Sequence, residues 1–319
     1  MPSYDELGPP FSSWDHFGRD DELGTINLLT PTRVAAAARL IVDGKRFSLD
    51  HPVNAFEPYP TGTRPATRHH VFANNEFHRD DWLDSFYLQS TSQLDSLRHI
   101  GHPEHGFYNG LPAAENNADS TRLGIHNWAD SGIAGRGVLL DVARFFGPSF
   151  DCETTVVLDA KTLDAIADAQ GVTWHGGDML LLRTGWAGNY VAKSPAERAE
   201  FNTRNRSPGL AQRTEILRWL WDHEIALVAS DTPAVEADPV LESDFRTPGE
   251  RPPEKGVNHS GMLHRPLIAL LGMAIGELWK LDDLAADCAA DGRYDFFLTA
   301  KPLNIPGGVG SPPNALALK

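Results

Sequence analysis

The densest group of potentially reactive side chains lies within residues 87–110, which contain three histidines, an aspartate and two glutamines. Side chains two residues apart share one face of a strand, so a strand would direct Gln89, Gln93 and Asp95 to the same side. His99 would join them if the chain bends after Asp95. Carboxylate and imidazole groups suit zinc or manganese, whereas amide oxygens are weaker and harder ligands. This pattern favours a metal site, and the alternative is a polar surface loop whose histidines make local hydrogen bonds.

Several charged and aromatic residues elsewhere are weaker candidates. Asp231 and Glu236 follow a predicted strand, where a carboxylate can belong to a site, although capping a turn is its commoner role. Arg183 ends another predicted strand, and its buried charge would need a site carboxylate, an anionic substrate or a structural ion pair. Trp14 and Phe107 would line an apolar pocket for a planar substrate, unless they belong to the core.

The elements that must position these residues alternate between strand and helix in the second half of the chain, which predicts an α/β fold. The predicted strands cover residues 47–53, 86–94, 137–142, 179–183, 225–230 and 294–300. The predicted helices cover residues 161–170, 209–223 and 281–290, and the stretch 264–271 starts helical. A further helix begins after the cap Thr30, has Pro31 in its first turn and ends before Gly44.

Two segments near the N-terminus are predicted to be irregular. Residues 1–29 are polar and interrupted by proline and glycine, which favours an ordered arm. Residues 57–82 are rich in Pro, Thr, His, Arg and Asp, which predicts a long loop of the kind that often has a function. Because no repeat or linker is visible, residues 1–319 are predicted to form one domain that carries this arm.

The charge and hydropathy of the chain argue against two classes of partner. The net charge is −15, whereas nucleic acids and anionic membrane surfaces select for basic patches. The apolar runs are far too short to span a bilayer. The N-terminus lacks the basic start and apolar stretch of a signal peptide, and the two cysteines are expected to be reduced thiols. We therefore expect a cytoplasmic protein that binds neither nucleic acid nor a membrane.

Residues 89–99 read Gln-Ser-Thr-Ser-Gln-Leu-Asp-Ser-Leu-Arg-His and resemble the His-x-Gly-Thr-His-x-Asp-x-Pro-x-His motif of the cyclase family of metal-dependent hydrolases. That family includes bacterial kynurenine formamidase and isatin hydrolase. The opening segment with DELGTINLLTP, the segment GIHNWADSGIAGRGVLLDV and the segment GDMLLLRTGW resemble family segments in the same order. The chain is therefore similar to a divergent long-form member, in which glutamine stands at both usual histidine ligand positions.

The resemblance assigns roles to individual residues. It implies that Asp95 takes the position of a bridging carboxylate and that His99 is the catalytic acid or base. In the family, a downstream histidine is followed about a dozen residues later by a glutamate, as His264 and Glu277 are here. The implied metal ligands are Gln89, Gln93, Asp95, His264 and Glu277. His102 or His105 would compensate for the two glutamines, and His259 is a further compensating candidate that is also the alternative to His264 as the downstream histidine.

The resemblance also implies a fold and an assembly. The expected fold is a swivelling β/β/α domain with a mixed central sheet and packed helices. Relatives form homo-oligomers in which a neighbouring subunit can complete the site, so we expect a homodimer or homotetramer. The implied cofactor is a divalent metal, zinc or manganese.

The activity that the resemblance implies is hydrolysis of an amide, lactam or lactone bond, with water activated by the metal and proton transfer by His99. Two alternatives remain open. One is a metal-independent cyclase or lyase that transfers protons through Asp95 and His99, an idea that the two glutamines favour. The other is a non-catalytic protein that binds a small molecule with the same fold. Sensitivity to a chelator and a search for any turnover would separate these hypotheses.

Overall fold

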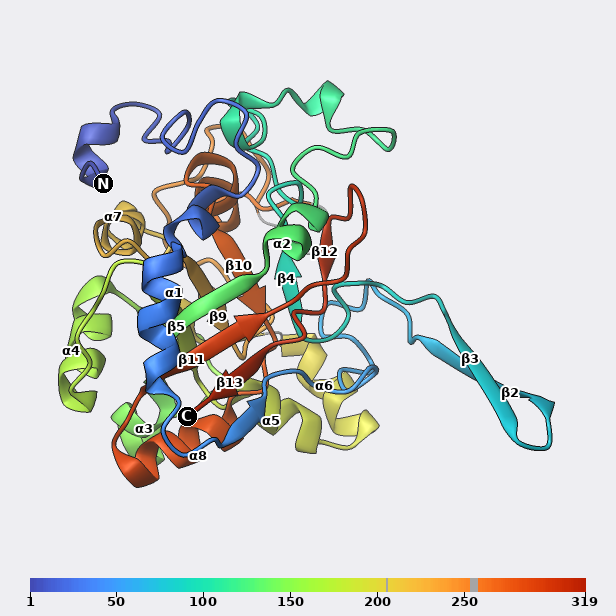
Figure 1. Cartoon of the computed structure of the whole chain (residues 1–319). Coiled ribbons are helices and arrows are strands. Elements are labelled where there is room, and N and C mark those ends of the chain that lie inside the picture. Colours follow the sequence, from blue (N-terminus) through green and yellow to red (C-terminus); the bar gives the residue numbers. More distant parts are fainter. Residues whose placement is uncertain (205, 253–257) are drawn as a thin grey trace.

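The centre of the molecule is a mixed β-sheet that curls through the computed structural model, which describes residues 1–204, 206–252 and 258–319 (Figure 1). In this part of the chain the sheet has nine strands in the order β1-β13-β11-β5-β7-β9-β10-β4-β12. The strands are β1 Arg46–Ser48, β4 Gln93–Asp95, β5 Ile133–Asp141, β7 Met179–Arg183, β9 Leu227–Ser230, β10 Ala274–Glu277, β11 Asp295–Ala300, β12 Gly310–Ser311 and β13 Leu316–Leu318. The predicted α/β class with a mixed sheet is confirmed.

Helices pack around this sheet (Figure 1). They are α1 Pro31–Ala37, α2 His126–Ser131, α3 Val142–Phe146, α4 Ala160–Gln170, α5 Trp186–Ala192, α6 Pro195–Arg204, α7 Thr214–Asp222 and α8 Asp282–Asp291. Single turns of 3-10 helix are η1 Tyr4–Leu7, η2 Gly24–Leu28, η3 Ala38–Leu40, η4 Tyr108–Gly110, η5 Ala113–Glu115 and η6 Gly147–Ser149, and η7 Arg265–Leu270 is a π-helix. None of the helices in the described ranges has the length and apolar character needed to cross a bilayer.

The core is built on four neighbouring parallel strands, β5, β7, β9 and β10. Leu181 of β7 lies between Leu139 of β5 and Ala229 of β9, and all three side chains are fully buried. Strands covered on both faces need apolar residues at every position, which explains the uninterrupted run Met-Leu-Leu-Leu in β7. The rigid parallel centre fixes the carboxyl ends of its strands, close to which the acidic candidates lie.

Strand β4 extends the sheet beyond β10 and brings two candidate residues face to face. It pairs antiparallel with β10, so that Gln93 lies opposite Glu277 and Asp95 lies opposite Ile275. On its other side β4 pairs with β12, where Gly310 lies opposite Asp95. A Cβ atom on Gly310 would come within 2.7 Å of the Gln89 side chain, so a glycine here allows Gln89 to lie against the strand.

Several predicted elements differ from the structure; for example, the predicted strand 47–53 forms strand only to Ser48, in β1. Only Gln93 to Asp95 form strand in the region predicted as 86–94, because the preceding residues turn and Ser90 Oγ donates to Tyr87 O at 2.7 Å. Residues 57–82 were predicted to form a loop. This prediction was wrong for most of the second half, which forms the hairpin of β2 (Arg68–Asn75) and β3 (His78–Asp84). Helix α7 begins five residues later than predicted, because residues 209–210 form β8 and pair with β6 (Val157–Leu158).

The N-terminal arm lies against the body of the molecule. The hydroxyl of Ser13 donates to Leu271 O at 2.9 Å, and the indole of Trp14 donates to Ala269 O at 2.8 Å. Tyr4 is buried, and its backbone N–H donates to the Asp222 carboxylate at 2.7 Å. These contacts hold Tyr4, Ser13 and Trp14 against the body, while the grouping of the chain into one domain with an ordered arm stays a prediction.

Candidate metal centre

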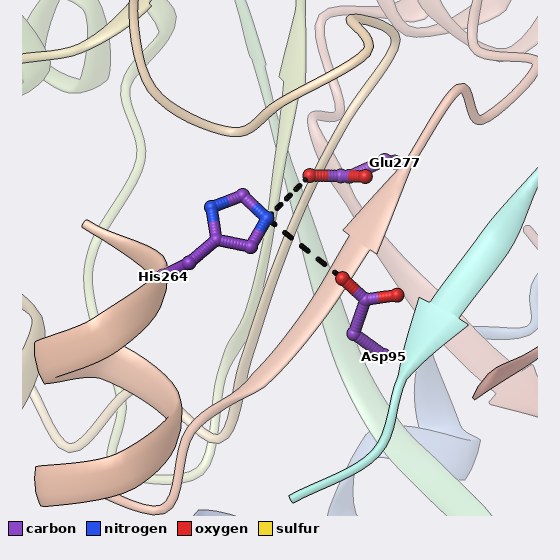
Figure 2. Close-up of side chains that lie close together, drawn as sticks. All are labelled: Asp95, His264 and Glu277. Carbon is purple, nitrogen blue, oxygen red and sulfur yellow. Dashed lines mark ion pairs between the residues drawn. The ribbon is translucent and has the colours of Figure 1, made fainter. Parts of the chain in front are cut away.

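Asp95, His264 and Glu277 converge on one buried point (Figure 2). Asp95 ends β4, Glu277 ends β10, and His264 immediately precedes η7. The Nε2 atom of His264 lies 2.9 Å from Glu277 Oε1 and 3.8 Å from Asp95 Oδ2. The three potential ligand atoms all lie within 4.8 Å of one another. Strand pairing sets the two carboxylates, and the start of the π-helix sets the imidazole.

Glu236 fixes the orientation of the His264 ring. Its Oε1 atom accepts from His264 Nδ1 at 2.9 Å and from the backbone N–H of Leu263 at 3.0 Å. Because a carboxylate only accepts, the proton lies on Nδ1 and Nε2 is turned toward Asp95 and Glu277. A carboxylate behind the imidazole of this kind is a usual feature of histidines that bind metals.

The buried charges change one another's pKa values. Burial raises the pKa of Asp95, and burial together with the Asp95 carboxylate raises the pKa of Glu277. Burial alone would lower the pKa of His264, but Glu236 and Glu277 outweigh it and hold that pKa well above its usual range. The pKa of Glu236 is lowered, because His264 outweighs the effect of burial. Two buried carboxylates that repel each other when both are ionised are typical of a cation-binding site.

The residues present fit a divalent cation. Asp95 Oδ2 and Glu277 Oε1 are buried, and neither has a hydrogen-bond partner among the described residues. The approach of His264 Nε2 to Glu277 Oε1 is therefore close in distance but is not directed as a hydrogen bond. Two carboxylate oxygens and one imidazole nitrogen form a donor set that zinc and manganese accept. Buried polar atoms without a partner are costly in an apo protein, and a bound cation would remove that cost.

The two predicted glutamine ligands lie beside the centre, with their amide nitrogens toward the carboxylates. Gln89 Nε2 donates to Asp95 Oδ1, and Gln93 Nε2 donates to Glu277 Oε2. Arg64 Nη1 donates to Gln93 Oε1 at 3.2 Å and also to the backbone carbonyl of Gln89. The structure therefore brings Gln89 and Gln93 to the centre as hydrogen-bond donors, and their role as ligands stays a prediction.

A cavity of about 850 Å³ opens onto the centre. His99 and His259 form part of its wall, with ring centroids 6.5 and 5.4 Å from that of His264. His99 Nε2 lies 3.7 Å from Asp95 Oδ2. Burial lowers the pKa of His99 to about 3 and that of His259 to about 3, so both rings are neutral near pH 7. The remaining wall includes Tyr59, Thr61, Arg64, Tyr87, Ile100, Pro233, Asp238, Arg246, Met262 and Glu277.

A family model described as "Putative cyclase" matches residues 47–237, more than half of the chain. The chain belongs to the cyclase family. A solved structure described as a novel cyclase is 34% identical, with a TM-score of 0.81 over 97% of this chain and 99% of that chain. These matches confirm the family that the sequence motifs indicated.

Two isatin hydrolases share the fold of this cyclase-family chain. Isatin hydrolase A from Labrenzia aggregata, solved with benzyl benzoate, is 16% identical with a TM-score of 0.56 over 90% of this chain and 96% of its own. Isatin hydrolase A from Ralstonia solanacearum is 16% identical with a TM-score of 0.58 over 91% of this chain and 98% of its own. A search of curated proteins returned no match.

Several predicted site residues of this cyclase-family chain lie outside the cavity wall. His102 and His105 stack on each other, with ring centroids 4.5 Å apart, in a turn closed by the bridge from His102 to Gly106. Trp14 and Phe107 pack against the core. Arg183 forms ion pairs with Asp141 at 3.1 Å and Asp282 at 2.7 Å, which is the structural alternative that the sequence left open.

The sequence weakly indicates one further residue at the site and does not indicate another. Glu236 is a minor candidate, because capping a turn is the commoner role of such a carboxylate and nothing in its spacing points to His264. Arg64 was not singled out, because it lies in the loop before β2, where no pattern of periodicity shows which side chains point inward. The one available signal was the position of Glu236 shortly after a buried strand.

Proposed function

We propose that this protein is a metal-dependent hydrolase that cleaves an amide, lactam or lactone bond of a small molecule. The observation that carries the proposal is the convergence of Asp95 Oδ2, Glu277 Oε1 and His264 Nε2. The two carboxylate oxygens have no hydrogen-bond partner among the described residues. Membership of the cyclase family and the shared fold of proteins named isatin hydrolases support hydrolysis. The cavity of about 850 Å³ suits a small-molecule substrate.

Asp95, His264 and Glu277 would hold a zinc or manganese ion. When bound, such an ion supplies Lewis acidity, which polarises a carbonyl group and lowers the pKa of water. Glu236 holds His264 Nε2 toward the ion by accepting from Nδ1. Asp95 and Glu277 neutralise the charge of the cation in a place from which bulk water is largely excluded, since all three candidate ligands are buried.

His99 would transfer the proton. Its ring is neutral because burial lowers its pKa to about 3, it lines the cavity, and 19% of its side chain is exposed. A neutral imidazole can accept a proton from water at Nε2 and return it to the leaving nitrogen or oxygen. The distance of 3.7 Å from His99 Nε2 to Asp95 Oδ2 supports a role for His99 beside the proposed ligands.

Arg64 would stabilise the negative charge that the carbonyl oxygen gains during attack and that the carboxylate product keeps. It lines the cavity, and it makes no ion pair with any carboxylate in the described part of the chain. Its guanidinium lies 4.6 Å from the ring centroid of Tyr59, and Nη1 donates to the Tyr59 hydroxyl at 2.7 Å. These contacts hold Nη1, so the rest of the guanidinium is presented to a ligand.

The experiment that tests the proposal combines metal analysis with an activity screen. Purified protein is assayed on panels of formamides, lactams and lactones before chelation, after chelation and after zinc or manganese is restored. We expect turnover that chelation abolishes and metal restores, and we expect Asp95→Ala, but not the exposed control Asp20→Ala, to lose metal and activity. Turnover that survives chelation would favour the metal-independent cyclase, and no turnover with any probe would favour a binding protein.

The cytoplasmic location and an assembly of two or four copies remain proposals. The assembly is proposed from the β2–β3 hairpin, which extends from the body of the molecule (Figure 1).

A further inference from the structure

Each carboxylate of the metal centre has one oxygen that is already engaged by an amide. Gln89 Nε2 donates to Asp95 Oδ1, and Gln93 Nε2 donates to Glu277 Oε2. The other oxygen of each carboxylate, Asp95 Oδ2 and Glu277 Oε1, is buried without a hydrogen-bond partner among the described residues. The two glutamines thus divide the four oxygens into two that are occupied and two that are available.

The neighbours of Gln93 fix which end of its amide faces Glu277. Arg64 Nη1 donates to Gln93 Oε1 at 3.2 Å, and the indole of Trp279 donates to the backbone carbonyl of Gln93 at 2.9 Å. A reversed amide would place its oxygen against a carboxylate oxygen and its NH2 group against a guanidinium. Both contacts are repulsive, so Gln93 is held as a donor to Glu277 rather than as an oxygen ligand.

Gln89 is held by the fold in a similar way. Its backbone carbonyl accepts from Arg64 Nη1, and its side chain lies against Gly310 of β12. Only an amide N–H can face Asp95 Oδ1 favourably, because the carboxylate carries no proton to donate when it is ionised. One arginine therefore anchors both glutamines, and both glutamines present N–H groups to the centre.

We propose that Gln89 and Gln93 make this a site for one metal ion, by acting as hydrogen-bond donors that reserve one oxygen of each carboxylate. The single divalent ion is held by Asp95 Oδ2, Glu277 Oε1 and His264 Nε2. A carboxylate that bridges two ions through its two oxygens needs both of them, and here one oxygen of each carboxylate already accepts from a glutamine amide. This inference rests on the metal centre of the proposed function and goes beyond it by assigning the number of ions and the role of the glutamines.

The balance of buried charge supports the same number. The carboxylates near the centre belong to Asp95, Glu236 and Glu277. One divalent ion compensates two of these three negative charges, whereas two ions would bring four positive charges to three buried carboxylates, and an excess of positive charge is unfavourable in a buried site.

Metal stoichiometry tests the proposal without reference to turnover. Wild-type protein is loaded with excess manganese or zinc and freed of unbound ions, and metal per chain is measured by elemental analysis and by calorimetric titration. The manganese form is also examined by electron paramagnetic resonance, which distinguishes an isolated ion from a coupled pair. We expect one ion per chain with the spectrum of an isolated ion. Two ions, or a coupled pair, would overturn the proposal.

The role of the glutamines is tested by giving both positions a side chain that can ligate. In the double variant Gln89→His with Gln93→His, the donors are lost and we expect the stoichiometry to rise above one ion per chain. If thermal unfolding shows that the double variant does not fold, the variant Gln93→Glu is used in its place to measure the metal stoichiometry. A stoichiometry of one in every folded variant would overturn the assigned role. Adding Asp95→Asn to either background should abolish the gain.

The test of the number of ions and the test of the proposed function can give different results. One ion per chain without turnover on any probe would leave the one-ion inference standing and contradict the hydrolase. Two ions with chelator-sensitive turnover would do the reverse. No ion after loading would overturn both, because both depend on Asp95, His264 and Glu277 as ligands.

Discussion

The pair formed by Glu236 and His264 is the feature on which the rest of the centre depends. Glu236 Oε1 accepts from His264 Nδ1 at 2.9 Å, while its other oxygen is buried without a hydrogen-bond partner in the described ranges. The carboxylate therefore orients the ring and fixes which nitrogen faces Asp95 and Glu277. In metal sites such a partner is worth about 10- to 100-fold in metal affinity.

Glu236→Gln should therefore lower the affinity for zinc or manganese by about 10- to 100-fold, since the amide is uncharged and orients the ring less strongly. Calorimetric titration of the metal measures this. The matched control is Glu242→Gln, whose side chain is 76% exposed and pairs with Arg213 at the surface. Equal affinities in wild type and Glu236→Gln would show that Glu236 does not support the ligand.

His99→Ala should separate proton transfer from metal binding. If His99 moves the proton, kcat falls by about 10²- to 10⁴-fold, the usual contribution of a general acid or base. Metal content should stay at the wild-type value, because His99 is not among the three converging ligands. The control is His102→Ala, a histidine outside the cavity wall. Full activity in a folded His99→Ala variant would remove His99 from the mechanism.

At the scale of residues, much of the centre could be predicted from the sequence. The structure brings together Asp95, His264 and Glu277, three of the five predicted ligands. What the sequence could not show is which oxygen of each carboxylate is free. For Glu277 that depends on the amide orientation of Gln93, which is set by an arginine twenty-nine residues away in the chain. Contacts between a loop residue and a strand residue leave no periodic signal.

At the scale of elements, Asp231 connects the ends of two central strands. It follows β9, and its Oδ1 accepts from the backbone and the hydroxyl of Thr184 at 2.8 and 2.7 Å, just after β7. Its Oδ2 accepts from Gly185 N at 2.6 Å, at the start of α5. The predicted structural role of Asp231 as a turn cap therefore agrees with its contacts.

Asp231→Ala should destabilise the fold by about 1 to 3 kcal/mol or more, because it leaves buried N–H and O–H donors without an acceptor. Urea unfolding at neutral pH measures the loss. Metal affinity should be unchanged, in contrast to the effect of Glu236→Gln, since Asp231 contacts none of the three converging ligands. Unchanged stability, or loss of metal from a variant that remains folded, would contradict a purely structural role for Asp231.

Asp50 should make stability depend on pH. Its carboxylate accepts from Asn314 N at 3.1 Å and Ala315 N at 2.7 Å, but burial outweighs these bonds and raises the pKa of Asp50 to about 6. The pKa of an aspartate in an unfolded chain is about 3.9. Between these values the native state binds the proton more tightly, so this group's contribution to stability is lost as pH rises from about 4 to about 6.

The measurement compares wild type with Asp50→Asn across that range. The asparagine cannot ionise, so wild type should lose stability relative to the variant between about pH 4 and 6, and the difference should be flat above it. Chemical unfolding at half-unit steps of pH provides the two curves. A difference that stays constant, or that grows in favour of wild type as pH rises, would contradict the raised pKa of Asp50.

The elements differ in how far their sequences predict them. Strand β7 has the predicted bounds Met179–Arg183, because an apolar run limited by Asp178 and Thr184 is unambiguous when both faces are buried. Strand β10 was not predicted, because Ala274–Glu277 is short and follows the apolar stretch of η7 closely. Helices α5 and α6 were also not predicted, since a short or polar helix gives a weak apolar stripe.

At the scale of the whole molecule, the hairpin of β2 and β3 stands apart. Figure 1 shows it extending far from the body. It exposes several large apolar side chains, Val71, Phe72, Phe77, Trp82 and Leu83. By strand alternation Phe72 and Trp82 lie on one face of the hairpin, and Val71 and Leu83 lie on the other. An isolated two-stranded hairpin is marginally stable in water, so exposed apolar residues on both of its faces favour a partner that covers them. The loop that supplies Tyr59 and Arg64 to the cavity leads directly into this hairpin, so its surroundings bear on the site.

We propose that a second copy of the chain covers the hairpin. Wild type should then be a dimer or tetramer by light scattering after size-exclusion chromatography, and the variant Phe72→Ser with Phe77→Ser and Trp82→Ser should be a monomer. The control is Val42→Ser with Leu241→Ser, which removes exposed apolar residues elsewhere, 70% and 58% accessible respectively. A monomeric wild type, or an assembly that survives the triple substitution, would contradict the proposal. If the monomeric variant keeps its metal but binds substrate more weakly, the hairpin also supports the loop that carries Arg64, because the three proposed metal ligands, Asp95, His264 and Glu277, lie outside that loop.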